Sequence, residues 1–480
     1  MAEPQVTVES MLPASTPAGQ SPVAVSKGWK SQTHTHVQSL GRVAVLVGIV
    51  AFSALVPLMP TNDMKADLTL LSGLVLVLGL YFLWRGGALS SRSRLDLPLI
   101  VFILAASLAT VLSPRSFLSF VPSRSRGDGL LIYVVYVLMG WAAARLRPDS
   151  AKLVLRGGLA GAIVIAAVAV GQFYGADPLR LLGFRAVDPG VFFGILPPPT
   201  ADLPYHGWRS FGTLGNPIFL GGYTLLVLPV IIAFVLASDR RCARYILLTA
   251  LAGTYAALLA SASRAAFAGL VLSVGMLLVV PPRLPRPWKR LVLVAGVLAA
   301  VTALLTLTGP GEELMGRARG GVSSQDGSLR MKLFVWKNIL PLIAQRPIFG
   351  WGFSNLAGRL PGIGSKEYFE IYGFALSGID TAHNEILHIA FSTGLLGLAA
   401  YLWIWAVVLK ALLAAVRHSG EHRAVAAGIL AGLAGYFLWL QSAWSHIGPA
   451  NVFWTLAGIA VALERSGKEA AASAVLTSQR

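Results

Sequence analysis

The chain has 480 residues, of which 55% are hydrophobic and 12% charged, and its mean hydropathy is +0.68. A soluble protein carries about 25% charged residues, so this composition excludes a soluble globular protein and indicates lipid as the solvent. The formal net charge of +18 does not indicate a nucleic-acid partner, because the basic residues form short clusters between apolar runs. We therefore predict an all-α integral membrane protein.

The N-terminal residues 1–38 are rich in Ser, Thr, Pro and Gln, a composition typical of disordered segments. They lack the short basic region and the cleavage site of a secretory signal, so we expect the first span to act as an uncleaved anchor. The single cysteine, Cys242, excludes a disulfide framework.

Twelve apolar runs are long enough to cross a bilayer, for which a helix needs about 20 residues. They are predicted near 41–60, 68–84, 97–113, 129–145, 153–174, 217–238, 245–261, 264–281, 291–308, 394–416, 424–443 and 449–465. These spans define a membrane domain over 39–466, with a cytoplasmic tail at 1–38 and another at 467–480.

Basic residues cluster in alternate connections between the spans. The clusters fall in 85–96, 145–156, 239–244, 283–290 and 417–423. The positive-inside rule makes this face cytoplasmic. The long segment 309–393, which we expect to be helical, then lies on the extracytoplasmic face.

The predicted helix centres are almost free of charge, whereas pumps and channels keep ionisable residues there, so function is expected at the outer helix ends. Arginines on that side stand where the topology rule disfavours them. The candidates are Arg126, Arg209, Arg264 and Arg330, with Arg124, Arg185, Arg317, Arg319 and Arg359 as weaker ones. A guanidinium fork grips phosphate oxygens in a bidentate way, which suits a lipid-linked diphosphate. The alternative is that each arginine snorkels or pairs with Asp128, Asp188 or Glu385.

An amphipathic stretch follows Arg330. Between Met331 and Ile343, apolar Leu333, Phe334, Trp336, Ile339 and Leu340 alternate with Lys332 and Lys337. This pattern predicts a helix that lies in the membrane interface with its lysines in water.

A histidine motif ends the long outer segment, Thr381-Ala382-His383-Asn384-Glu385, and an apolar run with Gly394-Leu395-Leu396-Gly397 follows. A neutral imidazole at the head of a helix can accept a proton from an attacking hydroxyl near neutral pH. We therefore expect His383 to be the general base, with Asn384 and Glu385 as supporting residues. The alternative is a helix cap or a surface histidine. Walker A, Rossmann, CxxC and HExxH motifs are missing, which argues against nucleotide-driven or zinc chemistry.

Together these motifs resemble the bacterial O-antigen ligase and polymerase family over residues 120–460. The resemblance includes Ser263-Arg264-Ala265-Ala266, where the family often has Gly in place of Ala265, and the run from Arg330 to Arg346-Pro347-Ile348-Phe349-Gly350-Trp351-Gly352-Phe353. It also includes Gly212-Thr213-Leu214-Gly215-Asn216-Pro217.

The resemblance implies a metal-independent membrane glycosyltransferase of the GT-C type in the bacterial inner membrane, without cofactors. It implies transfer of a glycan from undecaprenyl diphosphate to an acceptor hydroxyl on the outer face. Arg264 and Arg330 would then bind the diphosphate, Arg209 and Arg126 would match less specific positions, and His383 would activate the acceptor. Ligase, repeat-unit polymerase and protein O-glycosylation differ in the acceptor and stay open. From another class, a flippase for lipid-linked glycans remains the rival.

Overall fold

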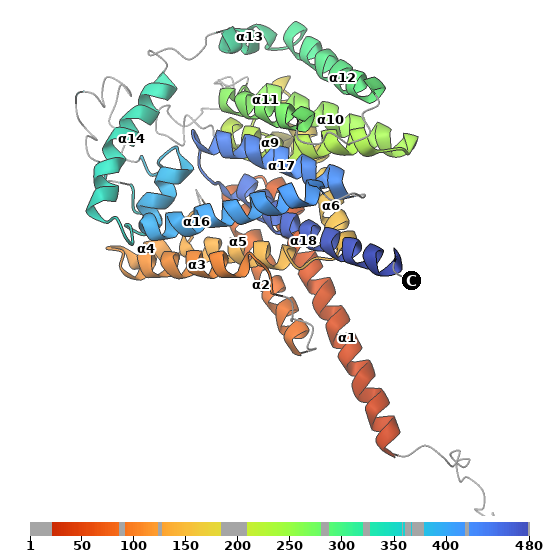
Figure 1. The fold of residues 1–480 in the computed structure, drawn as a ribbon. Helices are drawn as coiled ribbons and strands as arrows, with labels where there is room; N and C mark the ends of the chain where they lie inside the picture. The colour runs from red at the N-terminus through yellow and green to blue at the C-terminus, as the bar shows by residue number, and fades with distance from the viewer. Residues whose placement is uncertain are drawn as a thin grey trace, which may run out of the picture.

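The computed structural model describes residues 22–85, 92–122, 127–183, 209–279, 288–319, 327–357, 359–360, 366, 379–417 and 422–478. Within these residues the chain is helical, with short turns and loops between the helices (Figure 1). The prediction of an all-α integral membrane protein is confirmed.

Each of the twelve predicted spans overlaps a helix. The helices are α1 (Pro22–Val50), which continues through a π turn (Ala51–Leu55) and a 3₁₀ turn (Val56–Leu58), α2 (Asn62–Arg85), α3 (Asp96–Val111), α5 (Leu130–Ala143), α6 (Pro148–Phe173), α9 (Pro217–Ala237), α10 (Arg241–Ser261), α11 (Arg264–Val279), α12 (Trp288–Leu307), α16 (Glu385–Arg417), α17 (His422–Leu440) and α18 (Ile447–Ser478). Among the described residues, nine of these helices are long and apolar enough to cross a membrane, and α3, α5 and α11 are shorter apolar helices.

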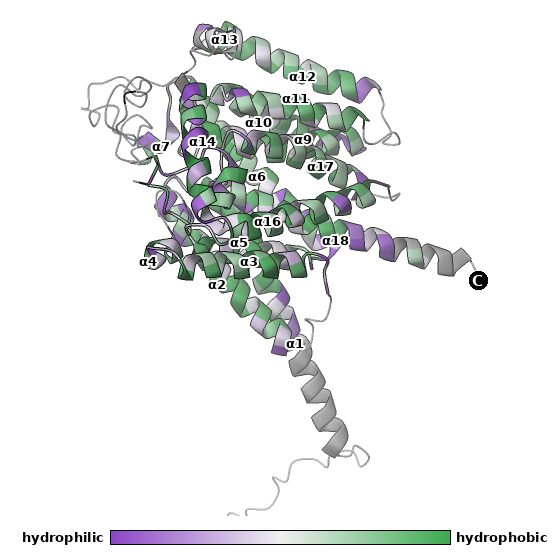
Figure 2. Ribbon diagram, turned by 60° about the vertical axis from the view of Figure 1, so that its left-hand side comes forward, coloured by the Kyte–Doolittle hydropathy of each residue, from purple (hydrophilic) through white to green (hydrophobic). Residues whose placement is uncertain are grey.

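Three short helices and the longer α14 gather at one end of the bundle: α4 (Ser116–Phe120), α7 (Pro178–Leu181), α13 (Gly311–Arg319) and α14 (Gly327–Gln345). In Figures 1 and 2, α14 lies across the ends of the long helices. We call this end the loop face, made of residues 112–122, 177–183, 209–216, 261–264, 327–352, 359–360 and 379–384.

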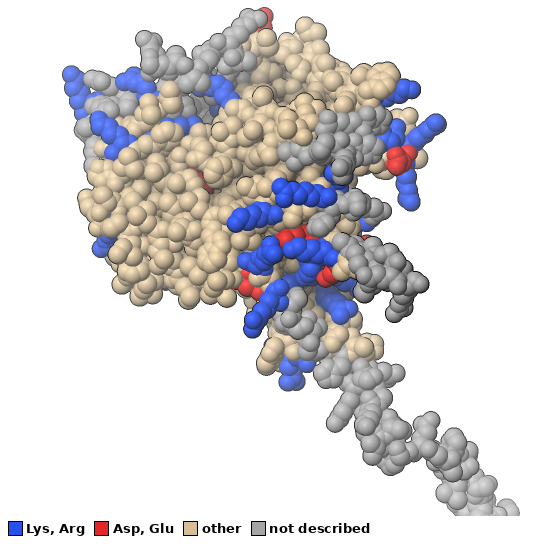
Figure 3. Space-filling model, viewed as in Figure 1, with Lys and Arg blue, Asp and Glu red and all other residues tan. Residues whose placement is uncertain are grey.

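The basic connections predicted to be cytoplasmic meet at the opposite end. There Arg145 pairs with Asp96 at 2.8 Å, and Arg290 pairs with Asp239 at 2.6 Å. Lys and Arg gather toward the two ends of the long helices, and an uncharged band of apolar residues lies between them (Figures 2 and 3). The two sets of connections are therefore on opposite faces, as their alternation predicts.

The last helix lies at the centre of the bundle. The most apolar stretch of α18 is entirely buried although its mean hydropathy, 1.3, is the lowest among the nine, whereas that of α12, at 2.2, is only 11% buried. A helix surrounded by protein does not need the hydropathy of one that faces lipid. High hydropathy does not by itself mark exposure to lipid, however, because the most apolar stretch of α9, at 2.5, is 89% buried.

The prediction for the amphipathic stretch is wrong for two of its five apolar residues, Phe334 and Ile339. Helix α14 contains Phe334 and Ile339, which are buried in a second hydrophobic core with Ala382 and Phe391, whereas Leu333 and Leu340 are exposed. The helix therefore packs against the head of α16 with one face. The sequence pattern showed an apolar face but not that protein, instead of lipid, covers it.

Candidate active site at the head of α16

The predicted histidine motif forms the start of α16. The Asn384 side chain caps the helix, because its oxygen accepts a hydrogen bond from Leu387 N at 3.1 Å, while its amide donates to the Gln441 carbonyl at 3.0 Å. Glu385 is buried and accepts two bonds from Ser445, from its backbone N–H and its hydroxyl, both at 2.7 Å. Asn384 and Glu385 therefore tie the head of α16 to the loop after α17.

His383 stands immediately before this cap in a left-handed backbone conformation, with φ of 50°. It is half-buried, and its ring meets Trp444 edge-on at a centroid distance of 4.9 Å. Its neighbour Ala382 accepts a hydrogen bond from the Trp336 indole of α14 at 3.0 Å. A left-handed histidine is uncommon and costs conformational energy, so the surrounding contacts hold this ring where it is.

A second histidine of the motif, His388, is buried one turn into α16. Its Nε2 lies 3.6 Å from Asp128 Oδ1, and the other Asp128 oxygen accepts a bond from Ser354 N at 3.0 Å. Burial raises the pKa of Asp128, but His388 and Ser354 outweigh it and hold that pKa below its usual value. From the sequence, Asp128 and Glu385 were possible partners of the arginines. In the structure Asp128 contacts His388 and Ser354, and Glu385 accepts hydrogen bonds from Ser445.

Helix α16 is kinked at Gly394, where φ is 69° and ψ is −177°. The loop 347–352 fills the kink: Trp351 N and Gly352 N donate to the carbonyls of Phe391 and Ser392 at 2.8 and 2.9 Å, and Leu395 N donates to Pro347 at 2.7 Å. We call this interlocked pair of segments the clasp. The clasp gives a structural reason for the glycine-containing segments 347–352 and 391–397. Backbone N–H groups of each segment donate to carbonyls of the other, so few of these buried groups lack a partner.

Glycine is required on both sides of the clasp. A Cβ at Gly394 would overlap with the Ile348 carbonyl, and one at Gly350 would lie 2.5 Å from Gly394 N. Gly350 also has a φ of 70°, which a residue with a side chain rarely adopts. The clasp thereby fixes the first turns of α16, which bear the histidine motif.

Two of the predicted arginines share one corner of the loop face. Arg209 Nε donates to the Ser261 carbonyl at 3.0 Å, and Ser210 N donates to Ala260 at 2.9 Å. These carbonyls end α10, and Arg264 begins α11 three residues later. The structure therefore brings Arg209 to the turn that carries Arg264.

This corner adjoins His383 through the first turn of α9. Phe219 packs edge-on against Trp444, the residue that also contacts His383, at 5.2 Å. Two residues further along, the backbone of Gly221 is so close to Ser263 that an added Cβ would lie 2.9 Å from the serine Cβ. One turn of α9 thus separates the surroundings of His383 from the arginine turn.

The loop before α9 is held by buried polar side chains that the sequence did not single out. Gln172 accepts from the N–H groups of Phe211 and Gly212 at 3.1 and 2.8 Å and donates to the Gly212 carbonyl at 3.0 Å. The buried Lys65 donates to the Thr213 carbonyl at 2.7 Å. The sequence does contain a signal for this contact: Lys65 lies in the first turn of α2. A charge at the end of a membrane span is costly unless it has a structural or functional partner.

Of the other two arginine candidates, Arg330 lies in the described part of the chain and stands apart from this corner. Arg330 is exposed in the first turn of α14 and is joined to His383 only along that helix, through Trp336. Arg126 lies outside the described residues, as do Arg124, Arg185 and Asp188. Among the residues that the structure describes, no group of three or more His, Cys, Asp or Glu could hold a metal ion.

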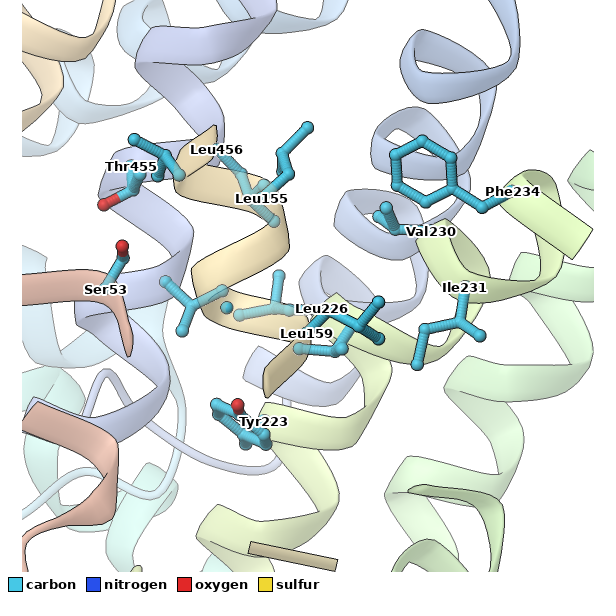
Figure 4. Close-up of a pocket in the computed structure, with 14 residues that line it drawn as sticks. Ser53, Leu155, Leu159, Tyr223, Leu226, Val230, Ile231, Phe234, Thr455 and Leu456 are labelled. Atoms are coloured by element: carbon cyan, nitrogen blue, oxygen red, sulfur yellow. The ribbon is translucent and has the colours of Figure 1, made fainter. Parts of the chain in front are cut away.

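An apolar cavity lies deeper in the bundle, between α6, α9 and α18 (Figure 4). Tyr223 and Phe234 mark its extent along α9, and Ser53, Tyr223 and Thr455 are its only polar lining side chains. Its volume of about 50 Å³ accommodates only a few water-sized groups. We therefore assign no ligand to it.

Comparison with known proteins gives one family. Residues 245–402 match the family model for O-antigen ligase, and a search of curated proteins found no significant match. The matched segment runs from α10 into α16 and includes Arg264, Arg330, the clasp and His383. This segment of the chain is therefore similar to the O-antigen ligase family, whose members are glycosyltransferases of the ligase and polymerase type.

Proposed function

We propose that this membrane protein transfers an oligosaccharide or polysaccharide from undecaprenyl diphosphate to an acceptor hydroxyl on the extracytoplasmic face of the bacterial inner membrane. The observation that carries the proposal is that a single turn of α9 links the surroundings of His383 to the turn that bears Arg209 and Arg264. A base and a pair of guanidiniums then flank one region of the loop face. The family match supports the reaction class.

The proposed reaction is a direct displacement at the anomeric carbon. The acceptor oxygen attacks that carbon and gives its proton to His383, and the bond from the carbon to the diphosphate oxygen breaks. The diphosphate leaves with the bonding electrons, and Arg264 and Arg209 stabilise its charge through bidentate hydrogen bonds. The configuration at the anomeric carbon is inverted. No metal is needed because the guanidiniums carry the positive charge.

The acceptor is the lipid A core in an O-antigen ligase, a second repeat unit in a polymerase, and a protein hydroxyl in an oligosaccharyltransferase. A flippase of lipid-linked glycans is the candidate from another class. Among the described residues, the buried side chains Lys65, Glu385, His388 and His446 lie at or within one turn of a helix end, and the buried Glu464 lies near the end of the apolar part of α18, Ile447–Glu469. A transport path needs polar groups at mid-bilayer depth, so this distribution favours the enzyme.

The test is glycan transfer from a purified lipid-linked donor, measured beside donor binding. We expect His383→Asn to lose about 10²- to 10⁴-fold in turnover while it still binds donor, since asparagine tolerates the left-handed backbone but is no base. We expect Arg264→Lys to reduce transfer because lysine keeps the charge and loses the fork. Arg180→Lys, on α7, is the matched control and should keep full activity.

Two outcomes would overturn this assignment. Full turnover in His383→Asn would remove the histidine from the chemistry. Unchanged transfer in both Arg264→Lys and Arg209→Lys would reduce these arginines to surface charges.

A further inference from the structure

Two arginines outside the proposed active site lie over one tryptophan of the loop face, and a third, Arg115, is held near them. The guanidinium carbons of Arg346 and Arg359 lie 4.5 and 4.9 Å from the centroid of the Trp351 ring. Arg115, at the start of α4, is the third member: burial, followed by the charges of Arg115 and Arg346, lowers the pKa of Arg359. Three like charges are therefore held close enough to disfavour one another.

A buried polar network keeps the three backbones in place. Asn355 donates to the hydroxyls of Ser113 and Ser119 at 2.9 and 2.6 Å, and Ser119 donates to the Phe353 carbonyl at 2.9 Å. Gly352 fits against the same serines, since a Cβ there would lie 2.5 Å from Ser119 Oγ. The segment with Arg115 is thus fixed to the turn between Trp351 and Arg359, so the convergence is built into the fold.

The group has more hydrogen-bond donors than acceptors. Arg346 donates to the Leu112 carbonyl at 3.1 Å, which uses one of the five N–H groups of a guanidinium. Arg359 Nε is buried without an acceptor. No carboxylate in the described part of the chain forms an ion pair with these three arginines. Simple snorkelling would spread the side chains into water and would leave no buried donor.

The surroundings place this group at a membrane surface. Val111, Phe117 and Ile348, which flank it on three elements, are 72%, 79% and 59% exposed. Exposed apolar side chains next to arginines and a tryptophan mark the boundary between hydrocarbon and headgroups. An anion that reaches this position is one carried by a lipid.

We propose that Arg115, Arg346 and Arg359, around Trp351, form a binding site for the phosphate group of a membrane lipid. The site is separate from the arginines proposed to hold the diphosphate, because α4 and α11 lie on opposite sides of the bundle (Figure 1). Phosphate oxygens accept bonds from several guanidiniums at once and offset their mutual repulsion. The site does not depend on the proposed transfer reaction.

The test measures lipid binding to the purified full-length protein by native mass spectrometry. The probes are phosphatidylglycerol, the zwitterionic phosphatidylcholine and inorganic phosphate, each without glycan donor. We expect phosphatidylglycerol to bind best, and Arg346→Gln and Arg115→Gln each to weaken it about tenfold or more. Arg346→Lys should weaken it less, because the charge remains. Arg180→Gln, which removes one charge from another part of the loop face, should bind like the unmodified protein.

Equal phosphatidylglycerol binding by Arg346→Gln, Arg115→Gln and Arg180→Gln would overturn the proposal. Binding of inorganic phosphate that depends on Arg346, together with no preference among the lipids, would also overturn it, since the site would then serve a soluble anion. Because no donor or acceptor is present, none of these results depends on whether His383 is catalytic.

Discussion

Replacement of Gly394 by alanine tests whether the clasp holds the head of α16. The backbone there, with φ of 69° and ψ of −177°, lies in a region that is essentially restricted to glycine, and its strain in another residue costs about 1–3 kcal/mol. The new Cβ would overlap with the Ile348 carbonyl, so the clasp must open. Loss of the bonds from Leu395 N to Pro347 and from Trp351 N to Phe391 adds about 0.5–1.5 kcal/mol each.

The total is about 2–6 kcal/mol, a large part of the free energy of unfolding of a typical domain, about 5–15 kcal/mol. The assay is thermal unfolding in detergent, followed by tryptophan fluorescence, with glycan transfer measured on the same preparations. Gly394→Ala should unfold at a lower temperature and lose transfer, because the histidine motif loses its support.

Gly275→Ala is the matched control, since nothing lies within 4 Å of its added Cβ. Within helix α11 alanine should be neutral or should stabilise by about 0.5–1 kcal/mol. Equal unfolding temperatures for the two variants would refute the view that the clasp stabilises the fold.

Other predictions address the site and the topology. Gln172→Leu leaves three backbone groups of the 211–212 loop unpaired, so unfolding should become easier by at least about 1–3 kcal/mol, and donor binding should weaken; Gln441→Leu, which loses an exposed bond, is the control. Asp128→Asn should lower stability at neutral pH, and its difference from the unmodified protein should vanish as the pH falls through the lowered pKa of Asp128. A membrane-impermeant thiol reagent should not label the exposed Cys242 in intact cells; labelling there would invert the topology. Transfer should survive EDTA, and loss with rescue by Mg²⁺ would assign Asp128, Asp380 or Glu385 to a metal.

The sequence predicted the spans because lipid imposes a local requirement on each of them. Every predicted span overlaps a helix, and most boundaries differ by only a few residues. The larger differences are at the start of α1, Pro22 instead of near 41, and at the end of α18, Ser478 instead of near 465. Helix α16 also begins early, at Glu385 instead of near 394. The prediction started the span at Gly394, where the chain kinks, since hydropathy does not show that a helix continues through a kink.

The site was less predictable because its construction depends on contacts far apart in the chain. The motif identified His383 and its cap, whose placement beside Arg209 and Arg264 agrees with the interpretation, although the roles of these residues stay predictions. Three of the site's contacts join segments separated by tens to hundreds of residues. They are the clasp, the contact of His388 with Asp128, and the hydrogen bond from Lys65 to Thr213. No periodicity or composition within one segment specifies such a pairing.

The central position of α18 has a consequence for biosynthesis. Helix α18 packs against α5, α9, α16 and α17 and is synthesised after all four, so these earlier helices must wait in the membrane with an incomplete interior. Chains generally fold from the N-terminus during synthesis, but here the core of the bundle closes only after α18 has been synthesised. A nascent chain stopped before residue 447 would have its spans inserted and yet no finished core, which makes it a substrate for membrane quality control.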